Sequence, residues 1–216
     1  MSLAPTPGKS VENLARAIHH LMEMRTLLAI TMTAGFCLLM PFAAHHRIFA
    51  NDATPSVEHH LRLYHTHTGE RIDIVYRRGE TFLPEAEAQL DHFLRDHRTG
   101  EVKHYDPRVF DILSELTSAV GHPEAEIDII CGYRSSWSNE FLRSKSAGVA
   151  KNSLHMQAHA IDIRIPGVDT LTLRNAALGL HEGGVGYYPR SGFVHVDTGR
   201  VRTWCYRCTA PHPVAE

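Results

Sequence analysis

The chain of 216 residues has almost no net charge and few cysteines, and both shortages exclude classes of function. A formal net charge of −2 at pH 7 gives no general electrostatic case for nucleic acid or an acidic membrane surface as partner. Of the four cysteines, Cys205 and Cys208 form a CxxC pair, whereas a structural zinc site normally needs a second pair. In an oxidising compartment this pair could form a local disulfide or remain as thiols. Cys131, flanked by apolar residues, is predicted to be a core thiol.

One long uncharged run is present near the N-terminus, from Thr26 to Ala44, directly after Arg25. A run of this length is typical of a signal-peptide core or a short membrane anchor. Residues 1–44 are therefore predicted to be an export signal or inner-membrane anchor, and the protein is expected in the periplasm. No clean cleavage site follows, so cleavage stays open. The polar residues 45–58 are predicted to be a linker, which leaves 59–216 as the functional domain.

The hydrophobic pattern of residues 59–216 predicts both strands and helices. Strand patterns occur at Leu61–His67, Arg71–Tyr76, Ile127–Cys131, Ala160–Ile165 and Phe193–Asp197. Helices are predicted from Pro84 to about His97, from Asp106-Pro107, from Ser135 or Ser136, and from Asp169 through Leu180. The closely spaced Gly183, Gly184 and Gly186 are predicted to form a flexible turn.

Three residues of this domain have the chemistry of a catalytic metal site. They are His155 in Ser153-Leu-His155, Asp162, and His195 in His195-Val-Asp197. Two imidazoles and one carboxylate are a ligand set for catalytic zinc, because three protein ligands leave the fourth position free for water. The chain has 17 histidines, so no single histidine is informative by itself.

Strand alternation gives a physical test of this set. Asp162 points away from Ile161 and Ile163, which must face the core, and His195 alternates with Val194 and Val196. If the two strands are neighbours, Asp162 and His195 can reach one ion at about 2.0–2.2 Å. His159 has the opposite parity from Asp162 and is left out of the ligand set.

The competing interpretation is a buried His–Asp hydrogen bond beside an unrelated surface histidine. The matched strand faces, the glycine-rich approach and the export context favour the metal site. Zinc is preferred to other metals because the ligands mix nitrogen and oxygen and no thiolate is expected nearby.

These residues resemble a known family. Ser153-x-His155-x-x-Ala158-x-Ala160-x-Asp162 resembles the SxHxxGxAxD signature of the zinc D-alanyl-D-alanine peptidases, a superfamily that includes the hedgehog fold. The stretch from Gly183 to Gly199 is more similar to the YcbK-like (MepK) murein endopeptidases, and residues 131–135 match their GYRS element. The resemblance extends over roughly residues 80–204.

The resemblance implies an α+β fold with a small antiparallel sheet, flanked by helices, that holds one Zn²⁺. His155, Asp162 and His195 would be the ligands, and Arg134 would hold a substrate carboxylate or stabilise the oxyanion. The implied substrate is a peptidoglycan cross-link, a peptide containing D-alanine or diaminopimelate. Tyr187 and Tyr188, with Trp137, could line the substrate groove, although core packing explains them equally well.

The sequence departs from the family pattern at two places. The signature glycine is Ala158, a mild change if the backbone there does not need a positive φ. The carboxypeptidase and dipeptidase branches carry a glutamate or a histidine where this chain has Gly192 and Phe193, so the usual general base is missing. Asp197 is the leading substitute, and its alternative is to orient a ligand or to pair with Arg164 or Arg134.

His181 and Glu182 are further options for the base.

The predicted function is that of a zinc-dependent murein endopeptidase, with membrane contact only through the N-terminal segment. Two alternatives stay open. One is a catalytically silent zinc-containing module that binds peptidoglycan, which fits the missing glutamate. The other is a zinc D-Ala-D-Ala-type carboxypeptidase that releases a terminal residue.

Overall fold

The computed structural model describes residues 56–146 and 148–208. The predicted export segment, residues 1–44, and most of the predicted linker lie outside these ranges, so their assignment stays a prediction. Strand β1 begins at Glu58, the last residue of that linker. Within the two described ranges, none of the helices has the length and apolar character that a bilayer crossing requires.

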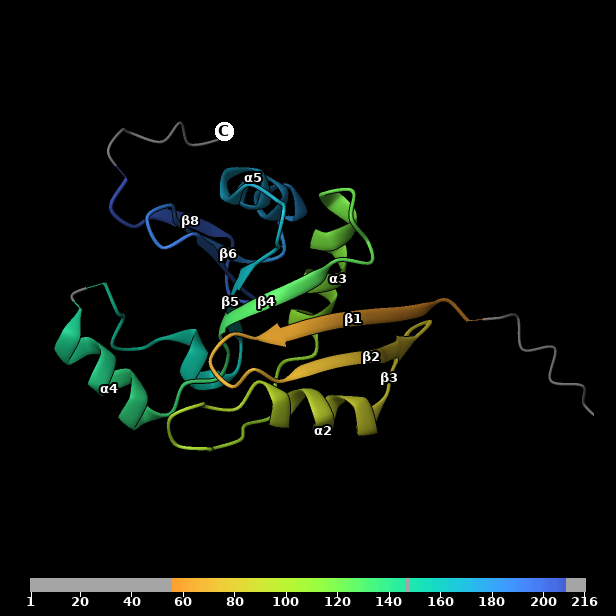
Figure 1. The fold of residues 1–216 in the computed structure, drawn as a ribbon, viewed down its shortest axis with the longest axis horizontal. Helices are drawn as coiled ribbons and strands as arrows, with labels where there is room; N and C mark the ends of the chain where they lie inside the picture. The colour runs from red at the N-terminus through yellow and green to blue at the C-terminus, as the bar shows by residue number, and fades with distance from the viewer. Residues whose placement is uncertain (1–55, 147, 209–216) are drawn as a thin grey trace, which may run out of the picture. The chain divides into compact units, whose positions relative to one another are not determined.

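The described residues form one mixed sheet of eight strands with helices packed beside it (Figure 1). The order across the sheet is β3-β2-β1-β4-β5-β7-β6-β8. The strands are β1 (Glu58–His65), β2 (Arg71–Arg78), β3 (Thr81–Phe82), β4 (Glu126–Cys131), β5 (Ala160–Arg164), β6 (Gly184–Tyr188), β7 (Phe193–Asp197) and β8 (Arg202–Cys205). The α+β prediction is confirmed. The sheet, however, is larger than predicted and is not purely antiparallel, since β1 pairs with β4 and β6 with β8 in parallel.

The described helices begin where the sequence predicts, except that the second begins at Arg108 with Pro107 as its N-cap residue, one residue later than expected. They are α2 (Pro84–Phe93), α3 (Arg108–Ala119), α4 (Ser136–Lys145) and α5 (Thr170–Leu180). The Ser135 hydroxyl accepts a hydrogen bond from the backbone N–H of Ser138 at 3.2 Å, and the Asp169 carboxylate accepts one from Leu171 at 2.9 Å. Helix α2 ends earlier than predicted. The chain turns there because the Asp96 carboxylate accepts backbone hydrogen bonds from Arg98 and Ser135.

The hydrophobic core fills one face of the sheet. Ile161 and Ile163 of β5 are fully buried and belong to one cluster with Leu90 of α2, Leu113 of α3 and Leu173 of α5. Fully burying an aliphatic side chain of this size contributes about 1.5–3 kcal/mol. The isoleucine face of β5 is therefore the core face, as predicted, and the residues that alternate with it are left for the opposite face.

Strand β6 corrects the prediction of a flexible glycine turn. Residues 184–188 pair with both β7 and β8. The glycines leave room for neighbouring groups: a Cβ on Gly184 would overlap the Asp197 carboxylate, and one on Gly186 would overlap the indole of Trp204. Strand β8, which the sequence did not predict, supplies that indole. Cys205, the last residue of β8, forms a disulfide with Cys208.

We expect Gly186→Ala to lower the free energy of unfolding by about 1–3 kcal/mol, because its methyl group has no space beside the Trp204 ring. The matched control is Gly179→Ala in α5, where nothing lies within 4 Å of the added carbon. That change should raise the free energy of unfolding by about 0.5–1 kcal/mol, because alanine favours a helix. Urea denaturation of both variants measures the difference, and equal effects would contradict the explanation.

Candidate metal centre

A row of cross-strand neighbours runs over the open face of the sheet. Asp162 of β5 is paired with Cys131 of β4 on one side and with His195 of β7 on the other. His195 is paired with Gly186 of β6, which is paired with Trp204 of β8. The prediction that β5 and β7 are neighbours is therefore confirmed, and their register places Asp162 directly beside His195.

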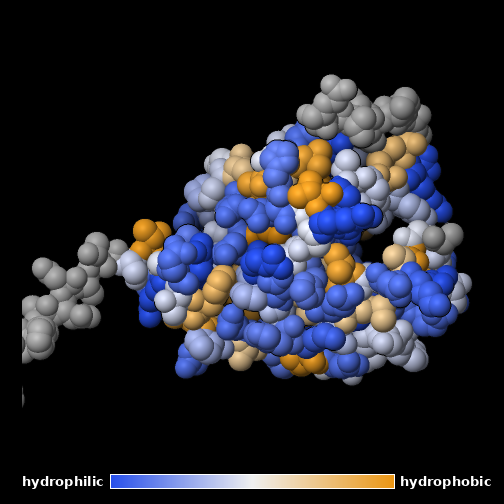
Figure 2. Space-filling model, turned by 180° about the vertical axis from the view of Figure 1, so that it is seen from behind, coloured by the Kyte–Doolittle hydropathy of each residue, from blue (hydrophilic) through white to orange (hydrophobic). Residues whose placement is uncertain are grey.

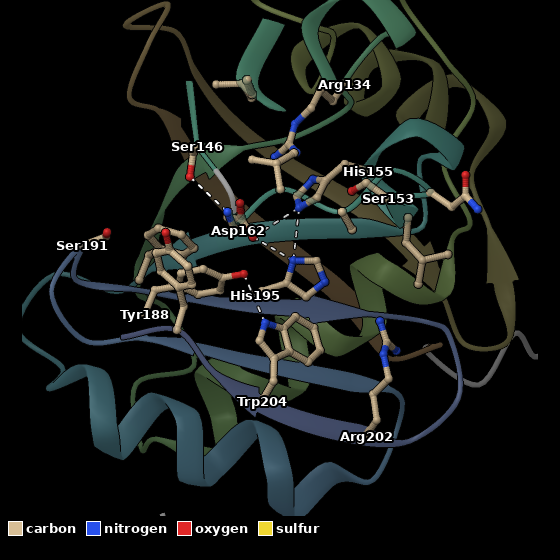
Figure 3. A pocket seen from close by; sticks show the side chains of 18 residues that line it. Arg134, Ser146, Ser153, His155, Asp162, Tyr188, Ser191, His195, Arg202 and Trp204 are labelled. Carbon is tan, nitrogen blue, oxygen red and sulfur yellow. Dashed lines mark hydrogen bonds and ion pairs between the residues drawn. The ribbon is translucent and has the colours of Figure 1, made fainter. Parts of the chain in front are cut away.

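The three predicted ligand residues converge at this row (Figure 3). The Nδ1 atom of His195 lies 2.8 Å from Oδ1 of Asp162, and Nε2 of His155 lies 3.2 Å from the same oxygen. The two ring nitrogens are 3.1 Å apart. All three side chains are buried. His155 reaches the row from the short helix η1 (Leu154–Gln157), which precedes β5.

The outer nitrogen of each imidazole has its own partner. Nδ1 of His155 is 2.8 Å from the carbonyl oxygen of Gly132, and Nε2 of His195 is 3.0 Å from Oδ2 of Asp197. When these outer nitrogens carry the proton and donate it, the inner nitrogens are left with lone pairs. Two lone pairs and a carboxylate oxygen then face one another, and this donor set fits a bound cation.

The electrostatics of the cluster also favour a cation. Burial by itself would lower the pKa of His155, but the charge of Asp162 raises it to about 10. Burial opposes ionisation of Asp162, yet His155 and His195 hold the pKa of its carboxyl well below the usual range. The carboxylate therefore stays charged. The Asp162 carboxylate attracts a proton on Nε2 of His155 as it would attract a metal ion. The proton and the metal ion therefore compete for this nitrogen.

Asp197 lies on the far side of the His195 ring from the other two predicted ligands. Besides the His195 contact, its carboxylate accepts hydrogen bonds from the guanidinium of Arg202 at 2.7 Å and from the backbone N–H groups of Gly184 and Gly199 at 3.0 and 2.9 Å. Burial would raise the pKa of Asp197, but these donors keep it below the usual range. The side chain is enclosed and does not line the pocket. This arrangement matches the ligand-orienting alternative better than a base.

The inner edge of the cluster opens into a pocket between α4 and β8, where the surface is hollowed (Figure 2). Arg134 lines the pocket, and its guanidinium points toward the cluster (Figure 3). Its Nη1 donates to Asn139 Oδ1 and its Nη2 to the Cys131 sulfur, each at 3.3 Å. These contacts hold a positive charge beside the three converging side chains.

The predicted substrate-contacting tyrosines are placed differently from each other. Tyr188 lines the pocket, where its hydroxyl accepts a hydrogen bond from the Trp204 indole at 3.1 Å and its ring stacks on Phe193. Tyr187 alternates with Tyr188 on β6 and does not line the pocket. Trp137 is 60% exposed on α4, so it belongs neither to the core nor to the pocket lining.

The remaining candidates lie elsewhere. His159 contacts Thr198 Oγ1 at 3.0 Å and Asp106 Oδ2 at 3.2 Å, away from the cluster, as its parity predicted. His181 and Glu182 do not line the pocket. Arg164 pairs with Asp128, not with Asp197.

Cys131 corrects a prediction, because it is part of the site and not only a core thiol. Its sulfur lies within 4.8 Å of donor atoms of both His155 and Asp162. The premise that no thiolate is near the ligands is therefore wrong. The alternation of β4 could not reveal this, because the register with β5 shifts between Ile129 and Cys131 and turns Cys131 toward the open face.

Ala158, in place of the signature glycine, has φ +57° and ψ +38° at the end of η1. Replacing the signature glycine by alanine would be a mild change only if φ were not positive, and this condition is not met. The left-handed region costs an alanine about 1–2 kcal/mol. Its side chain is nevertheless fully buried in the core cluster.

We expect Ala158→Gly to change the free energy of unfolding by less than about 1 kcal/mol, because relief of the backbone offsets the loss of a methyl group that contributes about 0.8 kcal/mol. Ala158→Val should cost more than about 2 kcal/mol, since a β-branched residue is an outlier at this φ and has no room. Thermal unfolding of the two variants distinguishes these effects. A well-tolerated valine would show that the left-handed turn is not required.

An α+β domain that brings two imidazoles and a carboxylate together beside a buried arginine in an open pocket has the arrangement of a metal-dependent hydrolase. Residues 53–204 match the family model described as peptidoglycan L,D-endopeptidase MepK. The chain belongs to this family, as its sequence motifs indicated.

Named proteins show the same relationship. The chain is 42% identical over 180 residues to the peptidoglycan L,D-endopeptidase MepK of Escherichia coli strain K12. The aligned region covers 83% of this chain and 96% of that protein. It is 44% identical over 144 residues to the probable peptidoglycan L,D-endopeptidase MepK of Haemophilus influenzae, covering 67% and 77% respectively. No solved structure is a significant match.

Proposed function

We propose that the protein is a zinc-dependent murein endopeptidase that hydrolyses peptide cross-links of peptidoglycan. The observation that carries the proposal is the convergence of His155 Nε2, Asp162 Oδ1 and His195 Nδ1 within 3.2 Å of one another beside Arg134. Membership of a family named for peptidoglycan endopeptidases supports the reaction and the substrate.

In this mechanism His155, Asp162 and His195 hold the metal. Zinc, when bound, would polarise the scissile carbonyl and lower the pKa of a water molecule. Arg134 is positioned to stabilise negative charge on the carbonyl oxygen or to hold a carboxylate of the peptide. Tyr188 and Trp204 form the opposite wall of the pocket and restrict where the peptide can lie.

Asp197 acts in this proposal by positioning His195. Its contact with Nε2 fixes the ring orientation and leaves Nδ1 directed at the metal. Asp162 is the single carboxylate among the described residues that line the pocket, so the geometry supplies no separate glutamate or aspartate as a base. Cys131 and Arg134 are adjacent groups that tune the charge of the site.

The same substrate places the protein outside the cytoplasm. Cross-linked peptidoglycan lies beyond the inner membrane, so we propose a periplasmic protein exported through residues 1–44, which either are removed or remain as an anchor. The described residues include all three proposed metal ligands.

We expect purified protein loaded with zinc to convert cross-linked muropeptide dimers to monomers. His155→Ala should lose both the bound zinc and the cleavage, because only two of three ligands remain. The matched control is His159→Gln, which alters a histidine four residues away that contacts Thr198 instead. Zinc content by mass spectrometry and products by chromatography are the two measurements.

The products also separate the alternatives. Release of one terminal residue would identify a carboxypeptidase, and binding without cleavage would identify the silent module, which the glycine at position 192 favours over the carboxypeptidase branch. Full cleavage and full zinc content in His155→Ala would overturn the proposal.

We expect Asp197→Asn to weaken zinc binding by about 10–100-fold, because the neutral amide holds the His195 ring less firmly. Competition with a chromophoric chelator gives the affinity. Asp128→Asn is the control, since Asp128 is a similarly buried carboxylate paired with Arg164 and makes no contact with a candidate ligand. An Asp197→Asn variant that binds zinc normally but loses cleavage would instead restore Asp197 as a catalytic group.

A further inference from the structure

Arg134 supplies a positive charge to the pocket, yet no carboxylate holds it in place. Its side chain is buried, and within the described parts of the chain it makes no ion pair with a carboxylate. Its two hydrogen bonds go to the Asn139 oxygen and the Cys131 sulfur, while its buried Nε has no partner among the described residues. Both bonds are 3.3 Å long, which is longer than most hydrogen bonds of this kind. The orientation of the guanidinium therefore depends on few and weak contacts.

Asn139 is suited to hold Arg134, because every polar atom of its amide is used. Its oxygen accepts from Nη1 of Arg134, and its nitrogen donates to the carbonyl oxygens of Ala150 and Lys151 at 3.2 and 3.3 Å. The opposite orientation of the amide would set N–H groups against the guanidinium and its oxygen against two carbonyls. The side chain is buried, so such unpaired groups would be costly. The contacts thus fix the amide in one orientation.

The same amide connects Arg134 to another part of the pocket wall. Ala150 and Ser153 line the pocket, and this stretch leads directly to His155 in η1. Asn139 lies on α4 and does not itself line the pocket. In Figure 3 the Arg134 guanidinium points toward the converging side chains from the same side as Ser153. One buried side chain therefore links the charged group to the wall without meeting a ligand.

The neutral charge of Asn139 also matters. A carboxylate at this position would bind Arg134 more strongly, because hydrogen bonds between charged groups are stronger than those between neutral ones. It would, however, compensate the positive charge that the proposed reaction uses, and it would place an oxygen against the carbonyls of Ala150 and Lys151. An amide oxygen restrains the guanidinium and leaves its charge available for an anion.

We propose that Asn139 is a positioning residue, which orients the Arg134 guanidinium for the anionic part of the substrate by fixing it to the wall at residues 150–153. This inference rests on the proposed function. The anionic part is either a carboxylate of the peptide or the negative charge that develops on the scissile carbonyl oxygen. Because Asn139 acts through Arg134, its removal should affect the reaction only while Arg134 is present.

The first experiment is a double-mutant cycle on kcat/KM for cross-linked muropeptide dimers. We expect Asn139→Ala to lower kcat/KM about tenfold when Arg134 is present, and by less than about twofold in an Arg134→Ala background. The matched control is Asn175→Ala, since Asn175 accepts a hydrogen bond from Arg174 at 3.0 Å and neither residue lines the pocket. A loss of the same size without Arg134 overturns the proposal, as does full activity of Asn139→Ala.

A second variant decides the proposal if the alanine variant does not fold. Asn139→Asp keeps an oxygen for Arg134 but adds a negative charge beside the guanidinium. We expect it to lower kcat/KM by about tenfold or more, because the charge is then no longer available to the substrate. An Asn139→Asp variant as active as the unmodified protein would contradict the role of the neutral amide and overturn the proposal.

The third experiment follows the guanidinium itself and does not depend on catalysis. In full-length protein with isotope-labelled arginine, NMR measures rotation about the Nε–Cζ bond of Arg134, whose signal is identified by its absence in Arg134→Ala. We expect this rotation to be about threefold to tenfold faster in Asn139→Ala, since one of its two hydrogen bonds is lost. Asn175→Ala should leave the rate unchanged. An equal rate in Asn139→Ala overturns the proposal.

These measurements separate the positioning role from the proposed function. If the unmodified protein does not cleave the dimers, the endopeptidase proposal fails, and the rotation rate alone decides whether Asn139 holds Arg134. If the unmodified protein cleaves them, but Asn139→Ala neither frees the guanidinium nor slows cleavage, only the positioning role fails.

Discussion

The pairing of Asp162 with His195 across β5 and β7 is the contact on which the rest of the site depends. It fixes two of the three converging atoms through backbone hydrogen bonds of the sheet, so their separation does not rely on a loop. His155 is then added from η1 and held by the carbonyl of Gly132. Each of the two candidate histidines has a partner behind it, as metal-binding histidines usually do.

Much of this centre was predictable from the sequence. Alternation in β5 separated Asp162 from the isoleucines, and the same alternation in β7 brought His195 to the matching face. The motif residues then supplied the family, which the comparison with known proteins confirmed. Caps at Ser135 and Asp169 were also visible, because hydrogen bonds at a helix start depend on neighbouring residues alone.

The features that the sequence did not predict correctly depend on contacts between segments far apart in the chain. The glycines of β6 suggested flexibility, but they accommodate Asp197 and Trp204, which no local pattern shows. Cys131 was assigned to the core because apolar residues flank it, and the register shift that turns it to the open face cannot be seen in the sequence. The role of Asp197 could not be chosen from its position, since only the contacts with Arg202 and two backbone N–H groups reveal how enclosed it is.

Strand β8 supports the candidate site although it contains none of the three candidate ligands. A chain ending just after Asp197 would keep all three converging side chains, yet it would lack Arg202 and Trp204. The Asp197 carboxylate would then be buried without its cation, and an uncompensated interior charge is among the most destabilising features a fold can carry. The smallest autonomous unit of this domain therefore extends through β8, well beyond the last motif histidine.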